Sequence, residues 1–271
     1  MRSRLPWLSV TLVAVLALPF RASAQRGPTP SDPKRPADTT ATKAAVPDLS
    51  GDWNSGAGAS WNSSDRNGRI LEDGTPYLPW ALAKLKSERP GFGANATFEN
   101  TTDPNIISCE PEGLPRIFFV PAKFRFVQEP DVVFILFEYG PTWVPVWLNR
   151  KHSDDPDPTW WGESVGQYES GDTLVVDSVG FNDKTWLDQV GRPHTDKLHL
   201  TQRFKRVDKG HLQLDIAFDD PGAYTKPWTG QKIFTLSDKG FARYLWVCSI
   251  DANKAFDEKV EKPTVVPASP R

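Results

Sequence analysis

The sequence predicts a mainly β protein, an antiparallel meander that closes into a barrel, with a two-sheet β-sandwich as the alternative. Short runs rich in Val, Ile, Leu and Phe follow one another from about residue 117 and are separated by turn residues. Several runs alternate apolar and polar positions, which is typical of strands with one buried face and one solvent face. No helical pattern separates the runs, so we expect neighbouring strands to pair.

The chain begins with a pattern typical of export. Two arginines precede an apolar run over residues 8–20, and Ala-Ser-Ala at 22–24 matches a signal peptidase site. This run is shorter than the roughly 18 apolar residues that span a bilayer. We therefore expect a signal peptide over residues 1–24 and a periplasmic or secreted mature protein. No membrane insertion is expected, because no other segment is long and apolar enough.

Composition divides the rest of the chain. Residues 25–47 are rich in Pro, Thr and Ala, which predicts a flexible linker, and residues 254–271 predict a flexible tail. A single β domain of residues 48–253 remains, a size that one barrel accommodates. It contains long loops and a short N-terminal helix over Pro76–Glu88, where Pro79 suits the first helical turn.

Four hairpins are expected within this domain, because turn residues join pairs of β-rich runs. The predicted pairs are residues 124–126 with 132–138, 165–169 with 173–177, 198–207 with 211–219, and 233–236 with 242–248. In the third pair Leu212, Leu214, Ile216 and Phe218 share one face, which makes them candidate core residues.

Charge and cysteine content limit the expected partners. The formal net charge is −2 and basic residues are interspersed with acids, so neither nucleic acid nor an anionic membrane is an expected partner. Cys109 and Cys248 are the two cysteines of the sequence. In an exported protein such a pair most often forms a disulfide, while two buried free thiols are the alternative.

Gly51-Asp52-Trp53 lies near the expected first strand and is similar to the G-x-W pattern of lipocalin-like barrels. This resemblance implies a closed barrel rather than a sandwich. It also implies that a late arginine, Arg243 in this chain, packs on Trp53 through a cation–π contact.

Three long sequence words follow one another along the chain. They are GDTLVVD at residues 171–177, GFNDKTWLD at 180–188 and DPGAYTKPW at 220–228. These words resemble those of a family of exported bacterial proteins without an assigned activity, and the resemblance extends over about residues 109–248. Tyr168 departs from the family pattern, which usually has Trp there. The resemblance implies export and assigns no reaction.

The stretch GRPHTDKLHL, residues 191–200, concentrates side chains that carry chemistry. One interpretation is a divalent metal site of His194, Asp196 and His199, which are ligand types of open Zn or Fe centres. A second is metal-free acid–base catalysis, in which His194 transfers protons and Asp177 or Asp196 orients its ring. The third is structural, with His194 hydrogen-bonded to a neighbouring carbonyl.

Aromatic and basic residues in the connections indicate a ligand site. Trp161 and Trp186 are expected to wall a concave pocket, and Arg150 and His152 are candidates for binding an anionic group. These residues predict an exported enzyme that acts on a small organic or sugar-derived molecule by His/Asp acid–base chemistry of the lyase, isomerase or hydrolase type. Such chemistry requires no cofactor. The alternative is a non-catalytic periplasmic ligand-binding or carrier module with an aromatic-lined cavity.

Overall fold

A computed structural model shows how the central part of the chain folds. The structure describes residues 46–55, 58, 60–61, 74–91, 100–140, 142–242 and 248–249. The chain divides into units of residues 1–43 and 44–271, and every described residue belongs to the second unit. The predicted signal peptide, the predicted tail and all but the last two residues of the predicted linker lie outside the described residues.

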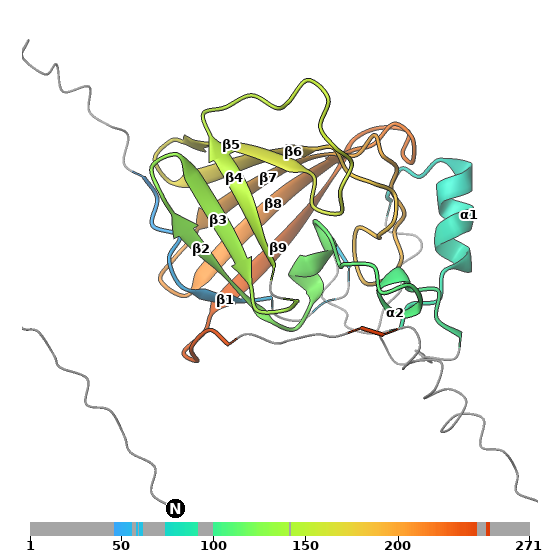
Figure 1. The fold of residues 1–271 in the computed structure, drawn as a ribbon, viewed down its shortest axis with the longest axis horizontal. Helices are drawn as coiled ribbons and strands as arrows, with labels where there is room; N and C mark the ends of the chain where they lie inside the picture. The colour runs from blue at the N-terminus through green and yellow to red at the C-terminus, as the bar shows by residue number, and fades with distance from the viewer. Residues whose placement is uncertain are drawn as a thin grey trace, which may run out of the picture. The chain divides into compact units, whose positions relative to one another are not determined.

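Nine strands in the described part of the chain form a closed barrel, and their spatial order follows the sequence (Figure 1). The strands are β1 (Asp52–Asn54), β2 (Lys123–Gln128), β3 (Val132–Phe137), β4 (Thr142–Leu148), β5 (Glu163–Glu169), β6 (Thr173–Val179), β7 (His199–Arg206), β8 (His211–Asp219) and β9 (Trp228–Leu236). β1 pairs with β9 and closes the barrel. The prediction of a mainly β barrel is therefore confirmed.

One strand pair departs from the expected antiparallel meander. β4 and β5 pair in parallel, through Val146 with Ser164 and Leu148 with Gly166, whereas all other neighbouring strands are antiparallel. The connection over residues 149–162 is long enough to return the chain to the opposite end of the barrel, which parallel pairing requires.

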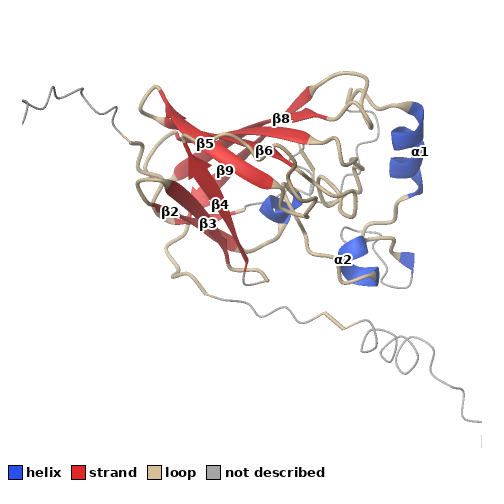
Figure 2. Cartoon of the chain, turned by 45° about the horizontal axis from the view of Figure 1, so that its top comes forward, coloured by secondary structure: helices blue, strands red, loops and turns tan. Residues whose placement is uncertain are grey.

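Three of the four predicted hairpins are present as β2–β3, β5–β6 and β7–β8. In the fourth, residues 233–236 belong to β9, which pairs with β8 and β1, while residues 243–247 lie outside the described residues. The predicted helix is α1 (Pro79–Ser87), with Pro79 in its first turn. Two shorter helices follow, α2 (Pro104–Ile107) and the 3₁₀ helix η2 (Arg116–Phe119), and Figure 2 shows α1 and α2 beyond one end of the barrel.

Aromatic side chains fill the barrel interior. Phe118 enters from η2 and is fully buried, with its ring centroid 5.3–5.8 Å from those of four strand residues. These residues are Phe124, Phe137, Phe204 and Phe234. The four candidate core residues of β8 are also buried, as their alternation predicts. Helix η2 therefore acts as a plug that packs the barrel with rings.

Trp53 of β1 is buried and its indole nitrogen donates a hydrogen bond to the Leu49 carbonyl at 3.0 Å. The guanidinium of Arg206, from β7, lies 5.2 Å from the Trp53 ring centroid. A cation from β7 therefore covers this tryptophan. Arg243 lies outside the described residues, so its contact with Trp53 stays a prediction.

The predicted disulfide is present between Cys109 and Cys248, whose Cα atoms lie 5.6 Å apart. It joins the segment before η2 to the chain after β9 and spans 139 residues of sequence. A loop of this length gives a disulfide a stabilising effect of at most about 5 kcal/mol in the chain-entropy model. A disulfide is compatible with an exported protein. None of the helices in the described residues has the length and apolar character needed to cross a bilayer.

Candidate functional site

The outer face of the barrel carries a continuous row of residues that pair across adjacent strands from β4 to β9. The row consists of Trp147, Val165, Asp177, Thr201, Ala217 and Thr229. Asp177 faces outward because Val176 and Ser178, on either side of it in β6, are buried inside the barrel. Its carboxylate is thereby presented to solvent at the centre of the row.

Two imidazoles approach this carboxylate from different elements. The Nε2 atom of His199, the first residue of β7, lies 2.7 Å from Oδ2 of Asp177. The Nε2 atom of His152, in the connection between β4 and β5, lies 2.8 Å from Oδ1. On the far side of His152, Nδ1 lies 3.0 Å from Oε1 of Glu163, the first residue of β5. We call His152, Glu163, Asp177 and His199 the His–Asp cluster.

The contacts within the His–Asp cluster limit which groups can donate and which can accept. Both ring nitrogens of His152 face carboxylate oxygens, so both contacts are hydrogen bonds only when this ring is the doubly protonated imidazolium. Although burial alone would raise it, hydrogen bonds from His199 and then His152 hold the pKa of Asp177 below its usual value. Hydrogen bonds from the Ser153 hydroxyl and backbone, with a further one from His152, lower the pKa of Glu163.

His199 is the end of this chain of contacts at which one ring nitrogen faces solvent. When its Nε2–H donates to Asp177, the neutral ring leaves Nδ1 as an acceptor. Nδ1 makes no hydrogen bond to any residue that the structure describes, and the side chain is 42% exposed. The Asp177 carboxylate thus orients an imidazole whose second nitrogen faces solvent, which is the arrangement of a general base.

A depression of about 390 Å³ lies on the outer face of β7, β8 and β9. Thr201, which lies opposite Asp177 and two residues beyond His199, belongs to its wall. The small side chains of Ala217 and Thr229 continue the wall across β8 and β9. These small side chains leave room for a small molecule on this face. The longer polar residues of the wall are Arg203, Asp215 and Gln231.

The structure does not bring His194 together with Asp177 or Asp196. His194 is buried, with its Nε2 3.1 Å from the Thr185 hydroxyl and its Nδ1 3.2 Å from the Thr195 carbonyl. Burial lowers its pKa, although the contact with the Thr195 carbonyl opposes that effect. The predicted His194–Asp pair is therefore replaced by the local contacts of the structural interpretation.

The predicted metal set also does not converge. His194 is buried, Asp196 is exposed in the turn before β7, and His199 contacts Asp177 instead. Within the described ranges no group of three or more His, Cys, Asp or Glu side chains is placed to hold a metal ion. His194 and His199 are five residues apart along a turn that enters a strand, and they face different environments.

The predicted ligand residues separate into three places. His152 belongs to the His–Asp cluster, and the exposed Arg150 lies nearby in the chain with its guanidinium 4.4 Å from the Trp147 ring centroid. Trp161 lines a different pocket at the end of the barrel. Trp186 is buried beneath the guanidinium of Arg116 at 5.0 Å, so it forms no wall at the His–Asp cluster.

Sequence reasoning missed Glu163, although a signal for it exists. Glu163 and Val165 are two residues apart in β5 and share its outer face, and Val165 pairs with Asp177. The register of this hairpin therefore places Glu163 on the same face as Asp177.

No family model, curated protein or solved structure matches the chain.

Proposed function

We propose that this protein is an exported enzyme of the periplasm or cell exterior that moves protons on a small organic molecule at the His–Asp cluster. One observation carries the proposal: the Asp177 carboxylate holds Nε2 of His199 at 2.7 Å while Nδ1 of the same ring makes no bond to any described residue. Such a pair places one ring nitrogen for proton transfer and fixes the tautomer through the other.

In the proposed reaction His199 Nδ1 accepts a proton from the substrate and later returns it to the product or leaving group. Asp177 stabilises the imidazolium that forms in between, since its carboxylate already accepts the Nε2–H bond. His152 contacts the second oxygen of Asp177, and Glu163 holds the His152 ring in place. This chemistry suits lyase, isomerase or hydrolase reactions and requires no cofactor.

The proposed substrate is a small organic or sugar-derived molecule that carries an anionic group. Arg150 stacks on Trp147 and makes no ion pair with any residue in the described ranges. A stacked guanidinium keeps its hydrogen-bond donors available for a carboxylate. The depression beside Thr201 would hold the reacting part of the same molecule.

The first test is proton exchange followed by NMR in D₂O, with a panel of small hydroxy acids and keto acids as probes. We expect the protein to exchange a carbon-bound proton of one probe, or to convert that probe. The change His199→Ala should slow this reaction by about 100-fold or more, the usual effect of losing a general base.

The matched control is His211→Ala. His211 is also an exposed strand histidine held by a carboxylate, with Nδ1 2.9 Å from Asp208, but it lies at the other end of the meander's β7–β8 hairpin. Its removal should leave the rate within about twofold of the original. Full activity in the His199 variant, or an equal loss in both variants, contradicts the proposal.

The alternative is a ligand-binding or carrier module without catalysis. A carrier for a lipophilic ligand needs an open apolar interior, whereas Phe118 and the rings around it fill this part of the barrel. The filled interior counts against a carrier function. The hydrogen bonds at Asp177 favour chemistry on the outer face of the barrel instead.

A further inference from the structure

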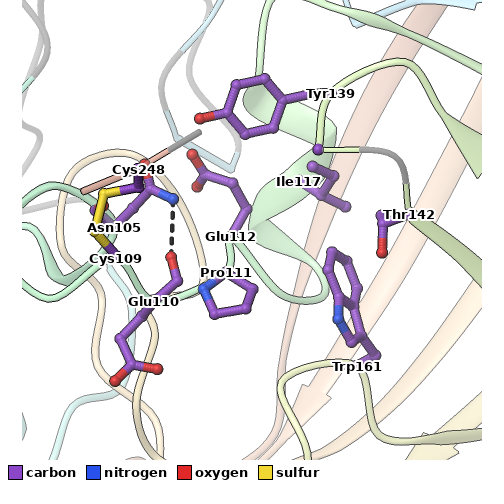
Figure 3. Close-up of a pocket in the computed structure, with 11 residues that line it drawn as sticks. Asn105, Cys109, Glu110, Pro111, Glu112, Ile117, Tyr139, Thr142, Trp161 and Cys248 are labelled. Carbon is purple, nitrogen blue, oxygen red and sulfur yellow. Dashed lines mark hydrogen bonds between the residues drawn. A yellow bond between two sulfur atoms is a disulfide. The ribbon is translucent and has the colours of Figure 1, made fainter. Parts of the chain in front are cut away.

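A second pocket, of about 380 Å³, lies where η2 meets the end of the barrel, and none of its wall belongs to the His–Asp cluster. Figure 3 shows its walls: the Trp161 indole faces Ile117 and Thr142 on one side, and the Cys109–Cys248 disulfide lies on the opposite side. The Pro111 ring lies between them. The volume is in the lower part of the range of small-molecule sites, so the pocket suits a compact ligand.

The charged groups at and near the pocket, Glu112 and Arg116, already contact other protein groups. Glu112 lines the pocket, and its Oε2 lies 2.8 Å from Nε of the fully buried Arg116. Arg116 also binds both oxygens of Asp103, at 2.9 and 2.6 Å, and Gln189 at 2.8 Å. The guanidinium thus faces protein groups rather than the pocket. An anionic ligand would meet the Glu112 carboxyl without a cation of the pocket wall to offset it.

Glu110 does not supply a free charge at the centre of the pocket. One oxygen of its carboxylate accepts a hydrogen bond from the Trp160 indole at 2.7 Å. In Figure 3 this carboxylate points away from Tyr139 and Trp161. The wall therefore offers a cationic ligand no dedicated counter-ion.

Polar groups at the pocket suit hydroxyl groups of a ligand. The Tyr139 hydroxyl points towards the Glu112 carboxyl in Figure 3, and the Thr142 side chain lies beside Trp161. Burial raises the pKa of Tyr139 well above its usual value, so the phenol keeps its proton, and this side chain also interacts with Asn105. Burial also raises the pKa of Glu112, against the effect of Arg116. The pocket combines the Thr142 hydroxyl, the Glu112 carboxyl and the flat Trp161 indole.

We propose that this pocket binds an uncharged polyhydroxylated ring of monosaccharide size. The Trp161 indole would cover the apolar face of the ring, while the Glu112 carboxyl and the Thr142 hydroxyl would bond its hydroxyl groups. The inference is independent of the reaction proposed for His199, because the two sites share no residue.

The test is titration of the full protein with D-glucose, D-mannose, D-galactose and myo-inositol, followed by saturation-transfer NMR and calorimetry. We expect at least one of these probes to bind saturably. The matched charged probes are D-glucuronate and D-glucosamine, whose binding through Trp161 should be at least tenfold weaker.

Two variants locate the binding. Trp161→Ala should weaken binding of the neutral probe at least tenfold, and Thr142→Val, which keeps the shape but removes the hydroxyl, should weaken it severalfold. Trp143→Ala is the matched control, because Trp143 faces outward next to Thr142 and is 56% exposed. It should leave binding unchanged.

Failure of all four neutral probes to bind overturns the proposal, as does binding that survives Trp161→Ala or equal Trp161-dependent binding of D-glucuronate. Binding should also persist in His199→Ala. If the original protein binds a sugar but exchanges no proton of any probe, the catalytic proposal alone fails. If it exchanges a proton but binds no sugar, the pocket proposal alone fails.

Discussion

Two charged networks in this protein use similar side chains in opposite surroundings. The buried Arg116 cluster, which consists of Asp103, Glu112, Arg116 and Gln189, is at most 6% exposed at any residue. The His–Asp cluster lies on the outer face of the barrel, with side chains between 21% and 42% exposed. In the first network a guanidinium is held by partners on both of its edges, whereas in the second one ring nitrogen of His199 remains open.

This difference follows from the cost of removing charge from water. A buried ion needs partners for nearly all of its polar atoms, because an unmatched charge in the interior costs several kcal/mol. A group at the surface can leave one atom to solvent at little cost, and that atom is then available to a substrate. The buried network therefore stabilises the fold around η2, while the exposed one is suited to chemistry.

The largest expected effect is on the buried side of this comparison. Arg116→Met leaves the carboxylates of Asp103 and Glu112 buried without their shared cation. We expect it to lower the free energy of unfolding by about 3–5 kcal/mol, measured by urea denaturation. The matched change in the exposed cluster, Asp177→Asn, should cost less than about 1 kcal/mol. Equal losses in the two variants would contradict the distinction between the networks.

Lys232 of β9 gives a second test of how burial affects a charged group, because it is a buried basic residue of the barrel wall. Its Nζ lies 4.4 Å from the Phe119 ring centroid, and burial lowers its pKa from 10.5 to about 8. Between these values the unfolded chain binds more protons than the folded protein, so stability should rise with pH from about 8 to 10.5. The total rise should be at most about 3 kcal/mol.

The measurement is the free energy of unfolding across this pH range, with Lys232→Met as the comparison. The methionine variant keeps an unbranched chain of similar length and does not titrate, so its stability should rise less with pH. Parallel pH profiles in the two proteins would show that the folded-state pKa of Lys232 is close to that of the unfolded chain.

On the exposed side, Asp177→Asn should affect turnover rather than stability. The amide oxygen can still accept the Nε2–H of His199, but it no longer stabilises the imidazolium by charge. We expect kcat for the proton-exchange probe to fall by about 100-fold or more. Asp208→Asn, at the carboxylate that holds His211, is the control and should leave kcat nearly unchanged. If kcat falls by a similar factor in both variants, the activity does not depend specifically on the His–Asp cluster.

The fold was largely predictable because its signals are local. Alternation in β8 identifies the buried face that begins at Leu212, and turn residues identify three of the hairpins. The parallel β4–β5 pair is not predictable in this way, because the path of the irregular connection over residues 149–162 depends on tertiary packing. The expectation that β4 and β5 pair antiparallel was wrong because local sequence patterns do not determine the direction of this pairing.

The site was predicted only in part, for the same reason. His152, Asp177 and His199 were all candidates, but each was assigned to a different role and a different partner. Proximity in sequence favoured pairing of His194 with Asp196, whereas strand register places His199 beside Asp177. Residues close along a turn point in different directions, while residues far apart meet when their strands pair.

The smallest expected effect concerns His194, which is buried like the Arg116 cluster and unlike His199. Burial lowers its pKa, so below about pH 6.5 the unfolded chain takes up a proton that the folded protein excludes. Stability should therefore fall as pH decreases through this region, by at most about 1 kcal/mol over the first pH unit. Urea denaturation of the original protein and of His194→Gln between pH 7.5 and about 5.5 measures the difference, because glutamine keeps a polar group near Thr185 but does not titrate. Identical pH profiles would mean that His194 accepts a proton in the folded state, and the ring would then belong with the accessible histidines rather than with the buried network.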